Sequence, residues 1–455
     1  LFVYTPDGER VLGAFTSKNN KASGRFATGL IPGDVCMIEY VEPREYPGRV
    51  RLSIEAVGHA YRDVPFAKRR KDFGSSNTCH VNVNCEEGSD KTDARDATAR
   101  ILVTQGQFTG WCTGVLVNNT AEDGTPYLLS AEHCAYDYDN NTLLPQSDID
   151  QWVFYFNYES ANCENPASEQ EIPNHSIVGA TRLATSDDEG GETGSDMLLL
   201  ELSERPQDHF EVYYAGWDRT DYGLLNPPPS SGFSIHHPVG DIKKISTFSD
   251  QLISTSYGSN PLLDSHWQVT WSSTPNGHGV TEGGSSGSAL FNNDQQVIGT
   301  LTGGSSTCDD SGAPDEYGKF SYHWSSNGSA ANRQLAPWLD PNNSGTETLS
   351  GRRFVVSSRP AAPGRYTSNT IPLIVKVYPN PSTDRFTLEM LPKLATGASV
   401  EVYNTIGGRV NARINREGAT EGKLSVDLAG NAAGLYFIKL RNGKYSTIEK
   451  VELTR

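Results

Sequence analysis

The sequence predicts an all-β protein, and three observations carry that prediction. Short apolar runs recur along the chain, turn-forming Gly, Asn, Asp and Pro separate them, and helical periodicity is nearly absent. This pattern is typical of antiparallel strands joined by tight turns. The chain has 455 residues, which is too long for one compact core. We therefore expect several β domains, of which the central one, residues 72–341, is long enough for two antiparallel barrels with a cleft between them.

Residues 1–71 are expected to form a small β-rich unit, because apolar and polar positions alternate along them. The unit ends in the basic run 68–71, shortly before the cysteine-rich region begins at Cys79. An ordinary charged linker would explain this run. We favour a processing site after Lys71, at which a pro-region would be cut from a zymogen.

Within residues 72–341 the strand candidates are short and rich in apolar residues. They are residues 101–103, 113–117, 127–129, 152–156, 197–202, 266–271, 289–291 and 297–301. Helical spacing occurs only over residues 331–339. This part of the chain is therefore predicted to be almost entirely strands and turns.

Residues 342–372 are rich in Ser, Asn, Pro, Gly and Arg and lack periodicity, so we expect a linker there. Strands return in residues 373–455, and their alternating pattern predicts a small β-sandwich. This last domain contains no His, Cys or Trp. It has little with which to perform chemistry, and we expect it to be an address or binding module.

The charge balance excludes some classes of partner. The net charge is 38 − 55 = −17, and a surface this acidic repels nucleic acid and anionic membranes. No run of eighteen apolar residues occurs in the sequence, so no membrane-spanning helix is predicted. The chain begins at Leu1 rather than Met, and we expect the natural N-terminus, with any signal peptide, to lie upstream.

The cysteines indicate an oxidising compartment. Six of the seven lie between residues 79 and 308, and none forms a C-x-x-C pair, which argues against a zinc or thioredoxin-like site. Six cysteines in one domain predict three disulfides and an extracytoplasmic location. Fifteen pairings are possible on the sequence alone. The seven are Cys36, Cys79, Cys85, Cys112, Cys134, Cys163 and Cys308.

The central domain is organised around the glycine- and serine-rich stretch 283–288, Gly-Gly-Ser-Ser-Gly-Ser. Apolar strand candidates follow it, whereas a flexible linker would have polar flanks. Glycine on both sides of a serine permits backbone conformations that expose Oγ and lets a substrate carbonyl approach the amides. A loop without chemistry is the alternative, and the neighbouring motifs argue against it.

Two upstream residues supply the partners that a nucleophilic serine needs. His133 follows the predicted strand 127–129, and Asp196 precedes the predicted strand 197–202. The order His, Asp, Ser along the chain is that of the chymotrypsin-type serine peptidases, one of several orders in which this triad occurs. Ser286 would attack, His133 would take its proton, and Asp196 would fix the imidazole tautomer.

Rivals exist for two of these roles. Ser285 and Ser288 compete with Ser286 for the role of nucleophile. Asp187 and Asp188 compete with Asp196, but they lie in an acidic run that predicts a solvated loop. The amides of Gly284 and Ser286 would form the oxyanion hole.

The central domain resembles the lysyl endopeptidases, a secreted branch of the chymotrypsin-fold serine peptidases. The matching segments are long and ungapped, and they are residues 79–85, 112–120, 131–134, 215–219, 235–238, 280–288 and 338–341. The resemblance implies the disulfides Cys79–Cys308, Cys85–Cys163 and Cys112–Cys134. It also selects Ser286, because the nucleophile of this family precedes Gly-Ser or Gly-Gly.

The resemblance also implies a carboxylate in the specificity (S1) pocket. Trypsin-like enzymes place an Asp six residues before the nucleophile, where this chain has Val280. In lysyl endopeptidases the pocket Asp follows the last cysteine, and matching through Cys308 gives Asp315. The intervening loop is shorter than in the family, so Glu316 and Asp310 are rivals.

The pocket wall and the activation route follow from the same resemblance. Thr302, Gly303 and Gly304 would line the pocket and pair with substrate backbone. Tyr257 and Thr302 stand where the family has a Trp and a His that stack near the active site. Ser285 precedes the nucleophile where trypsin has an Asp, so activation through a new amino terminus is not expected.

The C-terminal unit separately resembles the sorting domain of the type IX secretion system, on residues 378–381, 402–407 and 434–438. The resemblance implies export across a Gram-negative outer membrane, to the cell surface or the medium. The type IX machinery would then be a partner of this chain.

Together these observations predict a secreted serine endopeptidase that cleaves protein or peptide substrates after lysine, as a monomer without cofactor or metal. Two alternatives stay open. One is the same triad with Arg/Lys or another preference, and the other is a catalytically inactive surface adhesin on the same fold. A metal-dependent hydrolase is disfavoured, because His and carboxylate ligands do not cluster at suitable spacing.

Overall fold

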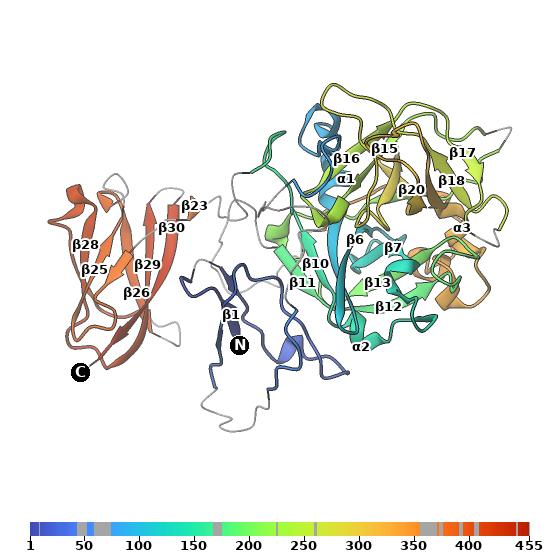
Figure 1. Ribbon diagram of the computed structural model, residues 1–455. Coiled ribbons are helices and arrows are strands. Elements are labelled where there is room, and N and C mark those ends of the chain that lie inside the picture. Colours follow the sequence, from blue (N-terminus) through green and yellow to red (C-terminus); the bar gives the residue numbers. More distant parts are fainter. Residues whose placement is uncertain are drawn as a thin grey trace. The chain divides into compact units, whose positions relative to one another are not determined.

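The computed structural model describes residues 1–8, 10–42, 52–58, 74–166, 175–223, 226–258, 262–354, 371–372, 376–390, 395–404, 409–442 and 445–454. The chain divides into two compact units, Leu1–Val356 and Ser357–Arg455 (Figure 1). None of the helices in these described ranges is long and apolar enough to cross a membrane.

The first large sheet of the Leu1–Val356 unit has seven strands, in the order β11-β10-β5-β6-β7-β13-β12, and all its pairings are antiparallel. The first four residues of β13 are buried completely, which explains why this strand has a continuous apolar run instead of an alternating one. The strands are β5 (Thr98–Gln105), β6 (Phe108–Val117), β7 (Tyr127–Ala131), β10 (Val153–Phe156), β11 (His175–Val178), β12 (Ala180–Thr185) and β13 (Met197–Leu202).

The second large sheet follows the order β17-β18-β21-β20-β19-β15-β16-β4, and β14 joins it through a parallel pairing with β20. A buried apolar cluster draws side chains from both sheets, among them Leu129 of the first and Phe291 of the second. The strands are β4 (Val81–Asn82), β14 (Gly216–Asp218), β15 (Gly232–His236), β16 (Lys244–Phe248), β17 (Ile253–Thr255), β18 (His266–Val269), β19 (Ala289–Asn292), β20 (Gln296–Gly304), β21 (Asp315–Lys319) and β22 (Thr348–Leu349).

These two large sheets share a buried cluster, and the predicted all-β fold class is confirmed. Smaller sheets accompany them. They are β2-β1-β3, formed by β1 (Phe2–Tyr4), β2 (Val11–Leu12) and β3 (Met37–Glu39), and the hairpin of β8 (Tyr136–Asp137) and β9 (Thr142–Leu143).

Helices are short, and the predicted helix over residues 331–339 is broken. It consists of the 3-10 turn η7 (Ala331–Arg333) and of α4 (Ala336–Leu339). The chain is extended at Gln334, between the two segments. Pro337 fits this arrangement, because proline lacks the N–H that would continue a helix from Arg333 but is tolerated in the first turn of α4. The other helical segments are α1 (Thr92–Ala97), α2 (Gln146–Ile149), α3 (Phe320–Ser325), η1 (Ser17–Asn19), η2 (Glu86–Gly88), η3 (Glu132–Ala135), η5 (Asp208–Phe210), η6 (Pro238–Gly240) and η8 (Ala419–Glu421).

The Ser357–Arg455 unit is a sandwich of two four-stranded sheets, in the orders β23-β30-β29-β26 and β24-β25-β28-β27. Alternate residues of β25 and β28, such as Phe386 and Val426, face a shared buried cluster, as the alternating sequence predicts. The strands are β23 (Ile371–Pro372), β24 (Lys376–Tyr378), β25 (Arg385–Glu389), β26 (Ser399–Asn404), β27 (Arg413–Asn415), β28 (Lys423–Asp427), β29 (Gly434–Asn442) and β30 (Tyr445–Leu453).

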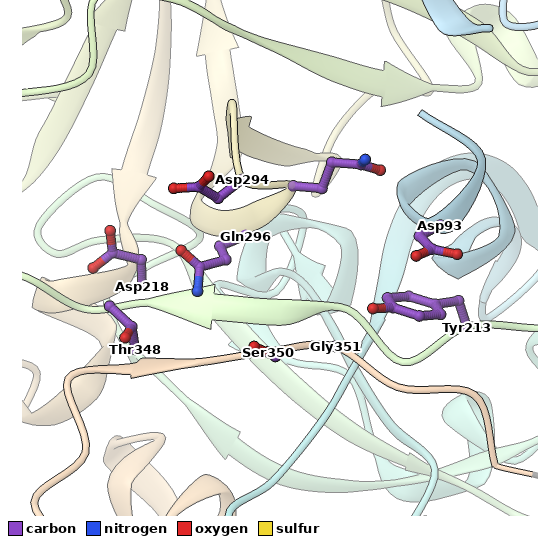
Figure 2. Close-up of a pocket in the computed structure, with 9 residues that line it drawn as sticks. Asp93, Tyr213, Asp218, Asp294, Gln296, Thr348, Ser350 and Gly351 are labelled. Atoms are coloured by element: carbon purple, nitrogen blue, oxygen red, sulfur yellow. The ribbon is translucent and has the colours of Figure 1, made fainter. Parts of the chain in front are cut away.

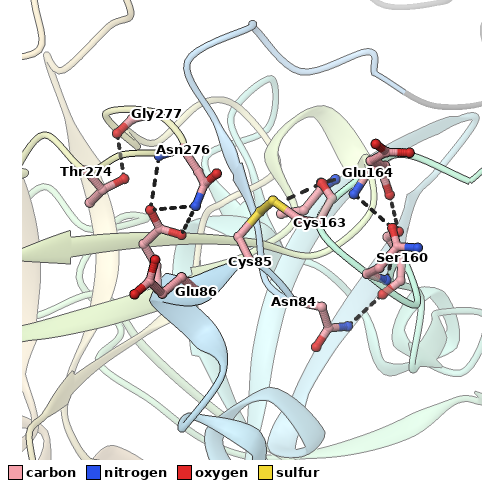
Figure 3. The surroundings of a disulfide bond; sticks show 12 residues. Asn84, Cys85, Glu86, Ser160, Cys163, Glu164, Thr274, Asn276 and Gly277 are labelled. Carbon is pink, nitrogen blue, oxygen red and sulfur yellow. Dashed lines mark hydrogen bonds between the residues drawn. A yellow bond between two sulfur atoms is a disulfide. The ribbon is translucent and has the colours of Figure 1, made fainter.

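Three disulfides tie the central domain together, and they join the pairs that the family resemblance implies. Cys112–Cys134 connects β6 to the turn that carries His133, and Cys79–Cys308 anchors the loop that leads to β21. Cys85–Cys163 bridges residues 78 positions apart, and Figure 3 shows it between the hydrogen-bonded group around Asn276 and the one around Ser160. Links of this span remove conformational freedom from the unfolded chain, by about 3–5 kcal/mol each in the chain-entropy account.

Candidate active site

His133 and Asp196 are brought together by strand pairing. His133 lies in η3, directly after β7, and Asp196 directly precedes β13. β7 and β13 are antiparallel neighbours in which Met197 pairs with Ala131. The register therefore places the residue before β13 beside the turn after β7.

Two hydrogen bonds hold the Asp196 carboxylate against His133. Oδ1 accepts the backbone N–H of His133 at 2.9 Å, and Oδ2 lies 2.7 Å from Nδ1 of its ring. Burial disfavours the imidazolium, but the Asp196 carboxylate outweighs it, so the pKa of His133 lies above its ordinary value. With Nδ1 bound to Asp196, Nε2 is left as the nitrogen that can accept a proton.

The structure separates the three candidate serines. Ser285 is fully buried, and its Oγ lies 2.7 Å from Nδ1 of His236. Ser288 is also fully buried, and its Oγ contacts Ser234 at 3.3 Å. Ser286 is the half-exposed member of the three. Because a nucleophile must reach substrate, this difference favours Ser286.

Two carbonyl groups of the serine loop, residues 283–288, accept hydrogen bonds from Thr113. Thr113 donates from Oγ1 to the carbonyl of Gly284 and from its backbone N–H to the carbonyl of Ser286, each at 2.8 Å. Gly284 has a φ of +95°, which a glycine adopts without strain. Within the described residues the N–H groups of Gly284 and Ser286 donate to no protein acceptor, so both are available to an oxyanion.

The serine loop sits directly on the strands that lead to His133. A side chain at Gly287 would come within 2.2 Å of Ser130 Oγ, so only glycine fits there. The Ser286 carbonyl lies 4.0 Å from the sulfur of Cys134. No hydrogen bond joins Ser286 Oγ to His133 in the described part of the chain, and in serine enzymes such bonds often tighten only once substrate is bound.

Asp315 begins β21 and is fully buried. Its Oδ2 accepts hydrogen bonds from Trp271 Nε1, Thr281 Oγ1 and Ser306 Oγ, at 2.7, 2.8 and 2.7 Å. Its Oδ1 accepts the backbone N–H of Ser306 at 3.1 Å. All four donors are neutral, and none of the ion pairs among the described residues includes Asp315.

The predicted pocket wall lies beside Asp315. Gly304 pairs with Asp315, and a side chain at Gly304 would meet its Oδ1 at 2.0 Å. Gly303 is covered by Tyr257, whose hydroxyl would lie 2.5 Å from an added side chain. The bulge at Thr302 breaks the β20–β21 register there. The two glycines thus leave room for a carboxylate on one face and a tyrosine on the other.

Thr302 and Tyr257 share a histidine as their neighbour. Thr302 Oγ1 lies 3.1 Å from Nε2 of His266, and the Tyr257 ring is 5.5 Å from the His266 ring. Burial lowers the pKa of His266 to about 4, so this ring is neutral at neutral pH. Sequence reasoning placed Tyr257 and Thr302 near the site but did not identify His266 as their partner.

The rivals for the carboxylate roles differ from Asp315 and Asp196 in strand pairing or in exposure. Glu316 follows Asp315 but is paired with Gly303 rather than Gly304, and burial raises its pKa to about 7. Asp310 is exposed in the preceding loop. Asp187 is exposed and paired with Arg333. Lys71 lies outside the described residues.

One expectation about this region is wrong. The acidic run 186–189 is expected to be a solvated loop, but Asp188 and Ser186 are buried, whereas Asp187 and Glu189 are exposed. The physical reason is that the Asp188 carboxylate accepts the backbone N–H groups of Gly191 and Asp196, at 2.9 and 2.7 Å. A buried carboxylate needs such donors, and the sequence does not reveal them.

Sequence reasoning missed further residues of the site. Glu132, next to His133, is fully buried, and Thr281, Ser306 and Trp271 all bind Asp315. Thr281 lies in a segment that carries the family resemblance, and this was the available signal. Nothing in the sequence marks Trp271 or Ser306.

A pocket of about 540 Å³ lies apart from these residues. Figure 2 shows Asp93 and Tyr213 toward one end and Asp218 and Asp294 toward the other. Asp218 is already engaged there, because its carboxylate accepts hydrogen bonds from Thr220 and Tyr222. No residue of the proposed triad lines this pocket.

The family model described as "Lysyl endopeptidase, C-terminal domain" matches residues 73–318, and the model described as "Secretion system C-terminal sorting domain" matches residues 376–453. A domain of the latter kind identifies a secreted or cell-surface protein of a Gram-negative bacterium.

A curated relative, a lysyl endopeptidase of Pseudomonas aeruginosa, is 32% identical over 295 residues. The match covers 63% of this chain and spans 57% of that relative's length.

Solved structures with partial likeness include a thermostable serine protease from an extremophilic microorganism, at 13% identity and a TM-score of 0.35. It covers 52% of this chain and 96% of its own. A Glu endopeptidase has 16% identity and a TM-score of 0.30, and covers 50% of this chain and 85% of its own. Scores this low add nothing to the assignment. On the family match over residues 73–318, this chain belongs to the lysyl endopeptidase family, a family of serine endopeptidases.

Proposed function

We propose that this chain is a secreted serine endopeptidase that hydrolyses peptide bonds on the C-terminal side of lysine. The observation that carries the proposal is the bond between His133 Nδ1 and Asp196 Oδ2, formed beside the half-exposed Ser286. Family membership supports the same reaction. The preference for lysine is inferred from Asp315.

In this mechanism Ser286 Oγ attacks the substrate carbonyl while His133 Nε2 takes its proton. Asp196 keeps the proton of the imidazole on Nδ1 and stabilises the imidazolium that forms. The N–H groups of Gly284 and Ser286 bind the oxyanion, and each such donor is worth about 3 kcal/mol in comparable enzymes. His133 then protonates the leaving amine, and water hydrolyses the acyl-enzyme by the same steps.

Lysine recognition rests on the carboxylate of Asp315. Asp315 is buried among neutral hydrogen-bond donors, and none of the ion pairs in the described part of the protein includes it. The ammonium group of a lysine side chain would supply a cationic partner. Gly303 and Gly304 leave the strand edge open to the substrate backbone, which would pair with it as an added strand.

The C-terminal unit would direct export through the type IX secretion machinery, as its family match supports. The domain limits 1–71, 72–341, 342–372 and 373–455 would then mark pro-region, protease, linker and sorting domain. The pro-region would be removed by cleavage near Lys71, which the enzyme could perform itself. Protein or peptide substrates are the expected partners, and we take the enzyme to be monomeric.

Cleavage-site mapping tests the proposal. The processed enzyme is incubated with a denatured protein mixture, and the new C-termini are read by mass spectrometry. We expect cuts after lysine that disappear in Ser286→Ala and survive in the matched control Ser285→Ala. A fluorophosphonate probe should label the wild-type protein and Ser285→Ala but not Ser286→Ala.

Each other outcome removes a distinct part of the proposal. Serine-dependent cuts at residues other than lysine would leave the triad but overturn the role of Asp315. Cuts that persist in Ser286→Ala would transfer the nucleophile to another residue. Absence of both cutting and labelling in processed, folded protein would favour the inactive adhesin.

A further inference from the structure

Two buried carboxyl groups lie behind the His133–Asp196 pair and have no role in the mechanism above. They belong to Glu132, which directly precedes His133, and to Asp188, in the segment 186–196 that ends at Asp196. Both side chains are almost completely shielded from solvent. Burial of a carboxyl group is costly unless donors surround it, so their hydrogen bonds explain why they are there.

Glu132 binds the near end of the segment. Its Oε1 accepts the backbone N–H groups of Asp188 and Gly190, at 2.9 and 3.4 Å. Its Oε2 accepts the backbone N–H of Asp187 and the hydroxyl of Ser186. The backbone N–H of Glu132 donates to the Asp196 carbonyl at 3.2 Å. Glu132 thus contacts both ends of the segment that carries Asp196.

Asp188 binds the far end of the segment. Its Oδ2 accepts the backbone N–H of Asp196 at 2.7 Å, and its Oδ1 accepts that of Gly191 at 2.9 Å. A side chain at Gly194 would come within 2.3 Å of Asp188 Oδ2, so glycine is required there. Asp196 itself has a φ of +58°, a conformation that needs support in a non-glycine residue.

The ionisable groups around this pair are mostly acidic. Burial and then Asp188 raise the pKa of Glu132 to about 8, and burial and then Asp196 raise the pKa of Asp188. The other ionisable groups that interact with the pair are His133, Tyr136, Tyr138 and Arg182, while Asp187 contributes its backbone N–H to Glu132. The carboxyl groups of Glu132, Asp188 and Asp196 thus lie close together, and burying them costs folding energy that their hydrogen bonds must offset.

We propose that Glu132 and Asp188 are positioning residues of the catalytic centre, whose hydrogen bonds fold residues 186–196 into the loop that holds Asp196 against His133. This inference rests on the proposed function, because it assigns the pair a part in orienting the general base. Glu132 fixes the segment to the turn that carries His133. Asp188 fixes the backbone of Asp196, and neither touches substrate.

The test compares Glu132→Ala, Glu132→Gln and Asp188→Asn with the control Glu189→Gln, all in the full chain after processing. Glu189 lies in the same segment but is exposed, so this control removes a charge without touching the buried pair. Active sites are counted with the fluorophosphonate probe, and kcat is expressed per labelled site. The proton resonance of His133 Nδ1–H is recorded by NMR for each variant.

We expect kcat per labelled site to fall about 10- to 100-fold in Glu132→Ala and Asp188→Asn, because small displacements of catalytic groups cost this much. KM should change little, since the substrate contacts remain. Glu132→Gln should recover part of the loss, as it keeps one acceptor oxygen. The His133 resonance should shift or broaden in the impaired variants, and Glu189→Gln should stay within about twofold of wild type.

The acid limb of kcat/KM adds a readout that a purely structural role would not move. The Asp188 carboxylate raises the pKa of His133, so Asp188→Asn should shift this limb to lower pH. Wild-type kcat per site, with an unchanged His133 resonance, in both Glu132→Ala and Asp188→Asn would overturn the inference. If the wild-type protein cleaves nothing, the proposed function fails, and the resonance still decides the positioning role in the folded chain.

Discussion

Asp196 and Asp315 are both fully buried carboxylates at the start of a strand, one in each large sheet. They differ in what surrounds them. Asp196 binds the ring and the backbone N–H of His133. Asp315 binds three neutral side chains and one backbone amide. One carboxylate is therefore bound to a titratable partner, and the other is bound only to neutral donors.

The difference indicates two separate roles. A carboxylate bound to imidazole acts on every substrate, because it sets the tautomer of the general base. A carboxylate held by neutral donors acts only on a substrate that brings a positive charge to it. Pairs of substrates that differ in charge should therefore distinguish the two residues.

The largest effect is expected for Asp196→Asn. An amide at this position would favour the wrong tautomer of His133, and kcat should fall about 10⁴-fold. The loss should be equal for a lysine substrate and for an uncharged activated ester, and steady-state kinetics on both substrates measures it. A loss confined to the lysine substrate would assign Asp196 to the specificity pocket instead.

A smaller and selective effect is expected for Asp315→Asn. Without the carboxylate, a lysine ammonium would be buried unpaired, and removing one partner of a buried pair costs about 3–5 kcal/mol. We expect kcat/KM for the lysine substrate to fall about 10²- to 10³-fold, a loss reduced by residual solvation. The uncharged ester should react at the wild-type rate.

The neighbouring Glu316→Gln is the matched control for Asp315→Asn, because it removes a carboxylate one residue away on the same strand. It should leave lysine preference intact. If Glu316→Gln is the more selective of the two, the family alignment through Cys308 is offset by one residue and Glu316 is the pocket carboxylate.

The sequence alone indicates His133 and Asp196, but it does not indicate what surrounds Asp315. His133 and Asp196 could be found because each borders an apolar run that forms a paired strand, β7 or β13. Local pattern is enough for such residues, since the strand register fixes their positions. Asp315 could be found only through the family resemblance, because its surroundings come from distant parts of the chain.

The supporting residues could not be predicted, for a physical reason. Trp271, Thr281 and Ser306 reach Asp315 from separate segments of the chain. No local periodicity of the sequence indicates that they meet there. For Asp188 the sequence leads to a wrong prediction instead of none, because an acidic run normally predicts solvent exposure. Its burial depends on hydrogen bonds from backbone N–H groups. Nearly every residue carries such a group, so the sequence does not show which of them will meet the Asp188 carboxylate.

On the acid side of the pH profile, kcat/KM is expected to fall about tenfold for each pH unit. In the proposed mechanism His133 must be neutral to accept the serine proton, and its pKa is raised because the Asp196 carboxylate outweighs the effect of burial. The midpoint of kcat/KM should therefore lie above about 6.5, the ordinary value for histidine. Because His133 serves all substrates, the lysine substrate and the uncharged ester should share this midpoint.

Glu316 provides the check on that assignment, since its pKa is raised to about 7 and lies in the same range. The acid limb should persist in Glu316→Gln. Its disappearance there would assign the titration to Glu316 and leave the ionisation of His133 unmeasured by this profile.

The smallest effect is expected for Thr281→Val, which removes one of four donors to Asp315 and keeps the side-chain shape. A buried acceptor that loses a donor costs about 1–3 kcal/mol, so thermal unfolding should shift down by a few degrees. Lysine cleavage should fall less than about tenfold, and the ester rate should not change. Because three donors remain, a loss as large as that of Asp315→Asn would mean that Thr281 itself contacts the substrate, and the pocket would then recognise lysine through the hydroxyl as well as the charge.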